Sequence, residues 1–561
     1  MPIFPPVLPT RPRRTRQRVL PSVAAWAVLG LAAAGAPVQA QALRVGVQEP
    51  PGVLDPMRAV TFSARHVLAS LCERLLDVDP QLRVVPGVAQ SWAWSGDGLA
   101  LTLSLPAGRR FHDGSPLDAA AAKANLDRVR AAPDGAATGR LDGVAEVAAP
   151  DPATVVLRLE RPDASLPARL AGPAGILVAP VRDPQDPFAP ASLAPASPAQ
   201  AASAQVSPAQ ASSAPASSAQ ASLAQARFAQ DANGAPVCSG PYRPAGSLPG
   251  GGVALERDDG HPDAAAYPLR QVLFLPQPDA LQAIAALRRG ELDVLERVAP
   301  ANFPLLDGDP GVRLQIDPGL GFQALAVNLR KRAGAAAGPL ADRRVRQALS
   351  LALDRDLIAQ SAGGGALAPA GQPFPPASPA FEPRFQPAGR DIDAARALLR
   401  EAGHERVAFE LLHGDDPLMR QVFELVRGMG AQAGFDITLA PLPFPALQRR
   451  LAAGDFQAAQ AGWAGRADPS GNIDPFLACR GALNDGGYCN PHLDRLLREA
   501  RGQSDPAARK GLYDQAQAIL QQDRPLIYLY YLPWPTALRT AVHGYQPHPD
   551  GLLRLRGVAV E

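Results

Sequence analysis

Three side chains able to recognise a ligand lie close together in the stretch AGWAGRADPSGNIDPF at positions 461–476. Trp463 offers an aromatic face, and Arg466 a permanently charged planar fork that pairs bidentately with carboxylates. A mostly apolar run followed by Gly-Trp-Ala-Gly is typical of a strand that ends in a turn. One hypothesis is that Arg466 binds an anionic group while Asp468 orients it or takes a ligand amine. The alternative is that Arg466 pairs with Asp468 or Asp474 and points to solvent.

The chain shows no catalytic signature. The motifs GxxxxGK[ST], GxSxG and HExxH and zinc-finger spacing are missing, and the eight histidines are scattered. The run His112-Asp113-Gly114-Ser115 resembles a triad, but contiguous residues in one turn are unsuited to a proton relay. We therefore predict no catalytic residues, no metal site and no cofactor.

Residues 1–40 have the layout of a secretory signal, with five arginines before the apolar run PSVAAWAVLGLAAAGAPVQA. Cleavage near Ala40 changes the formal charge from +2 to −3, with 50 basic against 53 acidic residues remaining. A basic nucleic-acid binder is therefore excluded. No cysteine lies near the cut to accept a lipid anchor. We predict a periplasmic protein.

Four cysteines remain in the mature chain, where the exported compartment favours disulfides. Cys479 and Cys489 flank a glycine-containing loop, and Cys72 and Cys238 are available for a second bridge. Three pairings are possible in principle, and metal binding is the rival interpretation.

The rest of the chain divides into a low-complexity segment and regions of alternating strands and helices. Residues 189–226 are almost entirely Ala, Ser, Pro and Gln, which predicts a disordered insertion. The alternation is clearest in the second half, and it indicates an α/β lobe whose strands end at one ligand-binding edge. The expected strands are 42–47, a strand after a hairpin turn at 96, 154–160, 407–413, 435–442 and 457–463. The expected helices are 63–76, 118–129, 342–359, 391–402, 418–430 and 447–453.

Six segments in order resemble one known family. They are residues 71–119, 239–244, 287–295, 328–358, 462–476 and 486–501. Together they are similar to the extracellular solute-binding proteins of family 5, the dipeptide and oligopeptide receptors of ABC importers. The resemblance covers essentially all of the mature chain except the insertion.

The resemblance implies an α/β fold of two lobes, the type II periplasmic-binding-protein clamshell. Lobe I would comprise 41–318 plus 533–561, with an extra subdomain at about 86–235, and lobe II would comprise 319–532. The two crossings, near Pro318-Gly319 and Leu532-Pro533, would form the hinge.

The implied function is capture of a peptide or peptide-like solute and its delivery to permease subunits in the inner membrane. A separate ATPase would drive transport, and the receptor would act as a monomer. Two alternatives stay open: a secreted peptide hydrolase, and a receptor for a non-peptide solute such as an opine, oligosaccharide, metal chelate or haem.

The resemblance also implies positions in the ligand cleft. Trp463 would form an apolar wall, and Arg466 stands near the place where dipeptide-binding relatives carry an aspartate. The facing lobe would supply Thr61, Phe62 and Ser63, whose hydroxyl and backbone groups would bind an extended ligand.

Ser63 has an alternative role, and two more residues are expected near the ligand. Ser63 equally fits a helix N-cap. Phe322 would approach the ligand from the hinge side. His413 would approach from a strand end, with a plain surface position as its alternative.

Overall fold

The structure is a computed structural model that describes residues 42–59, 61–132, 141–180, 230, 234–330 and 338–561. The predicted signal peptide (1–40) and the predicted insertion (189–226) lie outside the described residues. Residues 40–561 group into one unit by their contacts, and everything below concerns that unit.

Most of the strands join one large mixed sheet. Its hydrogen-bonded order within the described residues is β15-β14-β16-β12-β17-β11-β1-β10-β9-β8, and β13 pairs with β17 off this path. The strands of this sheet are β1 (Ala42–Val47), β8 (Tyr242–Leu248), β9 (Gly252–Arg257), β10 (Gln271–Pro276), β11 (Val294–Leu295), β12 (Val312–Val327), β13 (Ala368–Pro369), β14 (Val407–Gly414), β15 (Phe435–Leu442), β16 (Ala458–Trp463) and β17 (Leu526–Arg539).

Smaller sheets accompany it. A four-stranded sheet has the order β4-β5-β7-β6, and two pairs of strands stand apart from it. Their strands are β2 (Leu76–Val78), β3 (Val84–Pro86), β4 (Ser91–Trp94), β5 (Ala100–Ser104), β6 (Val144–Asp151), β7 (Thr154–Leu159), β18 (Val542–His543) and β19 (Ala559–Val560).

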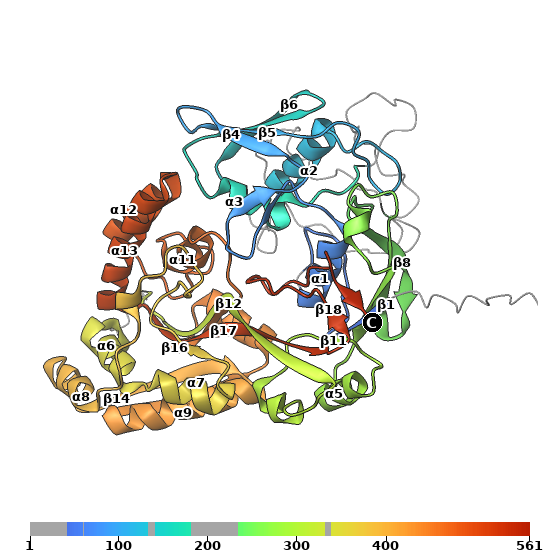
Figure 1. The fold of residues 1–561 in the computed structure, drawn as a ribbon. Coiled ribbons are helices and arrows are strands. Elements are labelled where there is room, and N and C mark those ends of the chain that lie inside the picture. Colours follow the sequence, from blue (N-terminus) through green and yellow to red (C-terminus); the bar gives the residue numbers. More distant parts are fainter. Residues whose placement is uncertain (1–41, 60, 133–140, 181–229, 231–233, 331–337) are drawn as a thin grey trace, which may run out of the picture. The chain divides into compact units, whose positions relative to one another are not determined.

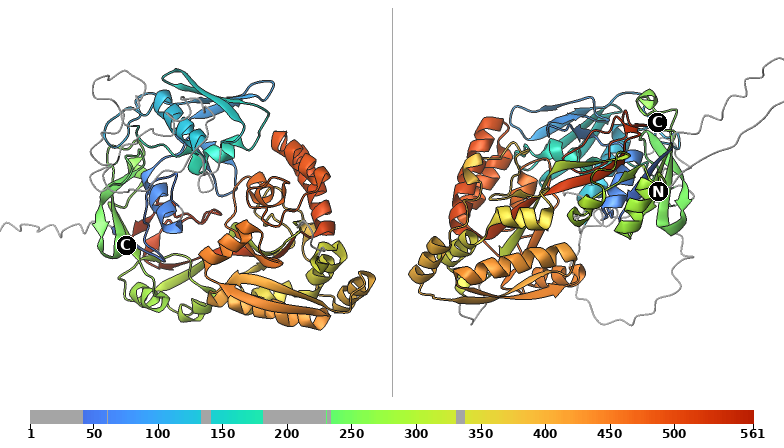
Figure 2. Two further views of the ribbon diagram at one scale, coloured as in Figure 1. Left: turned by 180° about the vertical axis from the view of Figure 1, so that it is seen from behind. Right: turned by 60° about the horizontal axis from the view of Figure 1, so that its bottom comes forward.

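Helices cover the sheets. In Figure 2 the orange helix α9 runs along β14 and β15, and its apolar face contributes Val422, Phe423 and Val426 to their shared core. The described α-helices are α1 (Phe62–Leu71), α2 (Ala119–Ala131), α3 (Leu166–Leu170), α5 (Ala280–Arg288), α6 (Arg343–Ala352), α7 (Arg355–Gly363), α8 (Ile392–Glu401), α9 (Pro417–Ala433), α10 (Phe444–Ala453), α11 (Ser470–Leu477), α12 (Pro491–Gly502) and α13 (Pro506–Asp523).

Strands β12 and β17 are the longest of the described strands, and they pair antiparallel along most of their length (Figure 1). The two predicted crossings lie opposite each other in this pair, with Pro318 facing Pro533 and Gly321 facing Leu532. The register shifts between Pro318 and Gly321. A side chain at Gly319 would place its Cβ 2.2 Å from the Leu532 carbonyl oxygen, so the strands can approach here only because residue 319 is glycine.

The predicted alternation of the second half is confirmed by α8, β14, α9, β15, α10 and β16 in order. Asp391 caps α8, and Gly403 after its end has φ 83°, as its predicted left-handed position requires.

Two predicted helices differ from the structure by more than three residues at one end. The single helix predicted over 342–359 is wrong: α6 ends at Ala352, and the Asp354 side chain accepts from the Leu357 amide to begin α7. The helix predicted over 63–76 runs instead from Phe62 to Leu71.

Both predicted disulfides are present. Cys72 bonds to Cys238 across 166 residues, and Cys479 bonds to Cys489 across 10 residues. The first ties the end of α1 to the segment before β8, and the second closes the loop between α11 and α12.

Candidate functional site

The turn after β16 is organised by one buried amide, that of Asn472 in α11. Its Oδ1 accepts from the Trp463 indole Nε1 at 3.0 Å and from the Arg466 backbone nitrogen at 2.7 Å. Its Nδ2 donates to the Arg466 carbonyl oxygen at 2.8 Å. Asn472 is only 1% exposed. It therefore fixes both the indole of Trp463 and the backbone of Arg466.

Two glycines make room for Arg466. Gly465 has φ +86°, and a Cβ there would lie 2.3 Å from the backbone carbon of Leu320. A Cβ at Gly471 would lie 2.7 Å from Cβ of Arg466. Neither position therefore tolerates a side chain. The absence of a side chain at Gly471 leaves room for the stem of Arg466, whose guanidinium carbon lies 4.2 Å from the Trp463 ring centroid.

Asp468 faces away from Arg466. Its two oxygens accept from Arg509 of α13 at 2.7 and 2.8 Å, and Oδ1 also accepts from the Ser470 amide at 2.9 Å. Burial favours the neutral carboxyl, but the Arg509 guanidinium outweighs it and holds the pKa of Asp468 below its ordinary value. Asp468 is therefore committed to a structural ion pair.

Asp474 is committed in the same way, since it pairs with Arg501 of α12. Burial raises the pKa of Asp474 to about 6, against the opposing charge of Arg501. Since Asp468 and Asp474 have arginine partners of their own, the predicted alternative that Arg466 pairs with one of them is wrong.

Arg466 thus has no ion-pair partner among the described residues, and its Nη1 donates to its neighbour's carbonyl oxygen, that of Gly465, at 2.7 Å. Burial, together with the smaller effect of the positive charge of Arg65 in α1, lowers the pKa of Arg466 to about 10. A half-buried guanidinium that makes no ion pair within the described residues is a position that favours an anion.

The beginning of α1 uses its polar groups internally. Thr61 is the N-cap: its hydroxyl accepts from the Ala64 amide at 3.1 Å and donates to the Pro51 carbonyl oxygen at 3.0 Å. Glu49 accepts from the amide of Phe62 at 3.2 Å. Ser63 lies inside the helix, fully buried, and its hydroxyl has no hydrogen-bond partner in the described part of the chain. The alternative of an N-cap at Ser63 is therefore wrong.

Phe62 stands at the centre of an aromatic and cationic group. Its ring stacks on Trp534 of β17, with centroids 4.8 Å apart and 20° between the planes. The guanidinium carbons of Arg297 and Arg65 lie 5.0 and 5.3 Å from its centroid. Arg297 pairs with Glu49 at 2.8 Å, whereas Arg65 makes no ion pair within the described ranges.

Arg65 and Trp534 were not predicted from the sequence. The available signal for Arg65 was that it is the one arginine or lysine of the segment FSARHVLASL, which forms α1. Beside Trp534 lies a cavity of about 10 Å³, which holds no more than one water. Its lining includes His66, Glu296, Arg297 and Trp534.

Phe322 and His413 are core residues. Phe322 pairs in register with Trp463 but is fully buried, with its ring edge-on to Phe476 and Tyr528. His413 is 2% exposed, stacks on Phe423 at 5.0 Å and bonds through Nδ1 to the Gly414 carbonyl oxygen. The expected surface position of His413 is therefore wrong.

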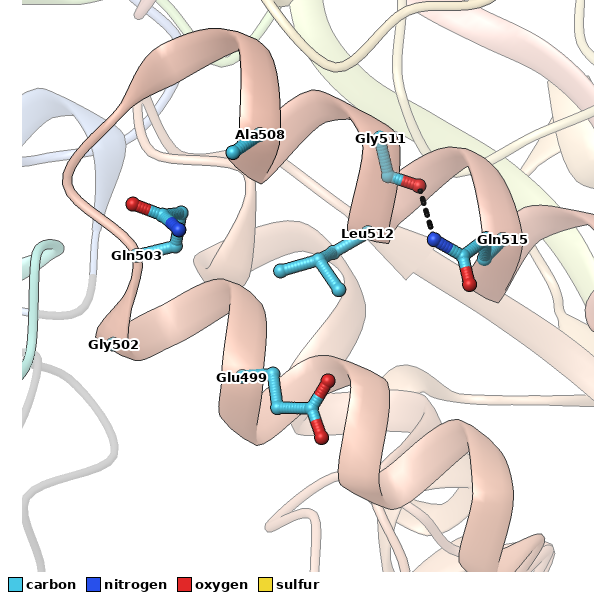
Figure 3. Close-up of a pocket in the computed structure, with 7 residues that line it drawn as sticks. All are labelled: Glu499, Gly502, Gln503, Ala508, Gly511, Leu512 and Gln515. Atoms are coloured by element: carbon cyan, nitrogen blue, oxygen red, sulfur yellow. Dashed lines mark hydrogen bonds between the residues drawn. The ribbon is translucent and has the colours of Figure 1, made fainter.

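A surface depression of about 530 Å³ lies between the neighbouring helices α12 and α13 (Figure 3). None of the predicted site residues lines it. Its lining consists of Glu499, Gly502, Gln503, Ala508, Gly511, Leu512 and Gln515. The side chain of Gln515 donates back to the Gly511 carbonyl oxygen of its own helix. Glu499 is the one charged residue of the lining, so charged groups do not converge on this depression.

The described residues contain neither a membrane-spanning helix nor a metal-binding cluster. No helix among them combines the length and apolar character needed to cross a bilayer. No group of three or more His, Cys, Asp or Glu side chains among them is arranged to hold a metal ion.

Comparison with known proteins gives a consistent result. The model of the bacterial extracellular solute-binding proteins, family 5 (middle region), matches residues 83–484. The di/tripeptide-binding protein 4 of Pseudomonas aeruginosa is 29% identical over 307 residues, which cover 53% of this chain and 57% of that protein. The chain thus matches little more than half the length of that relative. The glutathione-binding protein GsiB of Pectobacterium atrosepticum is 25% identical over 515 residues, 89% of this chain and 90% of that protein.

A solved structure agrees with the family match. The murein tripeptide binding protein MppA of Escherichia coli has a TM-score of 0.70 and 22% identity, covering 93% of this chain and 99% of that one. At this identity the likeness concerns the fold alone. It confirms the predicted α/β, periplasmic-binding-protein type II class.

Proposed function

Because the chain belongs to the bacterial extracellular solute-binding proteins of family 5, we propose that it is the receptor of an ABC importer. It would capture a peptide or peptide-like solute between two hinged lobes and deliver it unaltered to permease subunits served by a separate ATPase. The observation that carries the proposal is the family match over residues 83–484. The receptor would be exported by the signal at 1–40 and would act in the periplasm as a monomer.

The paired strands β12 and β17 support the proposed division into lobes at 318/319 and 532/533. Both strands are continuous through these points, and the points face each other in the sheet. Bending of both strands at this one level of the sheet would therefore move residues 319–532 as one body. Residues 41–318 and 533–561 would form the other body. The ligand shifts such an equilibrium only by its greater affinity for the closed form.

The solute class is supported by the relatives. The two curated proteins compared above are named for di- and tripeptides and for glutathione, which is itself a modified tripeptide. All the compared proteins are binding proteins, so binding is favoured over the alternative of a secreted peptide hydrolase.

The test is calorimetric titration of the mature protein, residues 41–561, with dipeptides, tripeptides and glutathione. Each mixture is then analysed by mass spectrometry after incubation. Saturable binding of at least one compound with its mass unchanged is expected. Cleavage that grows with protein concentration would refute the receptor function, and failure of the whole panel to bind would refute the peptide-like solute class.

A further inference from the structure

We propose, resting on the receptor function above, that the loop between β7 and α3 forms a latch with the C-terminal end of α12 and holds the two lobes closed. The latch consists of residues 162–165, in the extra subdomain of proposed lobe I, and of Arg501 and Gly502 in proposed lobe II. The backbone nitrogen of Ala164 donates to the Arg501 carbonyl oxygen at 2.7 Å. This contact between the lobes lies outside the paired strands β12 and β17 that carry the proposed hinge.

The loop is fixed by one carboxylate. Asp163 Oδ1 accepts from the Ser165 backbone nitrogen at 3.0 Å and from its hydroxyl at 2.5 Å, and Oδ2 accepts from Arg169 at 2.5 Å. Asp163 and Ser165 are 6% and 2% exposed. The residues on both sides of Ala164 are thus held inside the subdomain, while the amide of Ala164 bonds to the other lobe.

The acceptor is a carbonyl group in the last turn of α12, where helix carbonyls have no partner within their own helix. The preceding carbonyl, that of Ala500, accepts from Arg509 Nε at 2.9 Å in the same lobe. The Arg501 carbonyl accepts instead from Ala164 of the other lobe. Lobe I therefore completes the end of a helix that belongs to lobe II.

A van der Waals contact accompanies this hydrogen bond. A Cβ at Gly502 would lie 3.6 Å from the Pro162 carbonyl oxygen and 3.9 Å from the Pro162 Cβ. Both residues are exposed to solvent on their outer side. The latch is therefore a small contact at the surface, which water can enter when the lobes separate.

The side chain of Arg501 connects the latch to the turn after β16. Its Nε donates to Asp474 Oδ2 of α11 at 3.1 Å. Asn472, two positions before Asp474 in the same helix, holds the Trp463 indole and the backbone of Arg466. Hydrogen-bonded side chains and one helix thus join the proposed solute site to the contact between the lobes, so a solute that fixes this turn also positions the latch.

Opening at the hinge would have to separate Ala164 from Arg501, because their hydrogen bond joins the two bodies that move apart. Water would then bind both groups, so the bond contributes only about fivefold to the ratio of closed to open protein. A latch of this strength favours closure and still permits release. Because it recognises no group of the solute, it should strengthen the binding of every solute by the same factor.

The first test needs no solute. The 3.9 Å between Cβ positions at Gly502 and Pro162 is close to the spacing of about 3.8 Å in disulfides. The exported double variant Pro162→Cys/Gly502→Cys should therefore form a disulfide between the lobes, detected by mass spectrometry of unreduced peptides. The control, Pro162→Cys/Gly511→Cys, should not, because nothing lies within 4 Å of a Cβ at Gly511 in the neighbouring helix α13 (Figure 3). Free cysteines in both variants, or disulfides in both, would overturn the latch.

The second test removes the hydrogen bond. Ala164→Pro has no amide hydrogen to donate, whereas the control Ala164→Ser keeps it. For every peptide that wild type binds in calorimetry, Ala164→Pro should bind about fivefold more weakly, and Ala164→Ser should bind as wild type does. Equal affinities of the two variants, or losses that differ from peptide to peptide, would overturn the latch. If Ala164→Pro does not fold, or if no peptide binds to wild type, the cysteine pairs still decide on the latch, and the second outcome refutes only the peptide-like solute class.

Discussion

Replacing Asn472 by alanine should destabilise the protein by removing the amide that organises the turn after β16. The change removes three hydrogen bonds, to the Trp463 indole and to both backbone groups of Arg466. A net value of about 1 kcal/mol for each buried bond gives a loss of about 3 kcal/mol in the free energy of unfolding. The 1% exposure of Asn472 means that water cannot readily replace the lost partner.

The assay is urea denaturation followed by tryptophan fluorescence and by circular dichroism. Asn472→Asp is a second variant: its carboxylate keeps both acceptor bonds, but it buries a charge and replaces the donation to the Arg466 carbonyl by a contact between two oxygens, so it should also lose about 1–3 kcal/mol. Gln515→Ala is the control: this exposed amide of α13 should change stability by less than about 0.5 kcal/mol. A loss below about 1 kcal/mol for Asn472→Ala would refute the idea that this amide organises the turn.

Two further predictions concern buried charge and covalent links. Burial raises the pKa of Asp474 to about 6, above its unfolded value, so its contribution to stability is complete below about pH 4 and is lost as the pH rises through 6. The unfolding free energy of wild type relative to Asp474→Asn should therefore fall by about 2–3 kcal/mol between pH 4 and 7, and parallel pH profiles would contradict this. Replacing Cys72 and Cys238 by alanine should lower the free energy of unfolding by about 5 kcal/mol, and replacing Cys479 and Cys489 should lower it by about 3 kcal/mol. The first disulfide closes a loop of 166 residues and the second a loop of 10, so the first restricts the unfolded chain more. Equal losses in the two double variants would show that loop entropy does not set the difference.

Local sequence signals predicted the elements of the second half well. Asp391 and Gly403 bound α8 as expected, since capping and left-handed termination depend on residues adjacent in sequence. The same logic explains the error at 342–359. Asp354 falls inside the single predicted helix, but its side chain caps α7, and periodicity alone does not distinguish one bent helix from two.

The site was less predictable because its partners are distant in sequence. The stretch 461–476 drew attention to Trp463, Arg466 and Asp468 together, yet Asp468 bonds to Arg509, 41 residues away. No local pattern announces that pairing. Arg65, whose charge lowers the pKa of Arg466, is about 400 positions away from it in the sequence, and only the fold relates the two charges.

The turn that carries Arg466 is also in contact with the proposed hinge. A Cβ at Gly321 would lie 2.2 Å from the carbonyl oxygen of Trp463, and one at Gly465 would meet Leu320. These close approaches place the start of the turn directly against the bulged part of β12, where its register with β17 shifts. Movement at the crossing would therefore redirect the Trp463–Arg466 stack, because no side chain lies between them to absorb it. If the lobes close as proposed, the position of the hinge and the direction of the Arg466 side chain therefore change together.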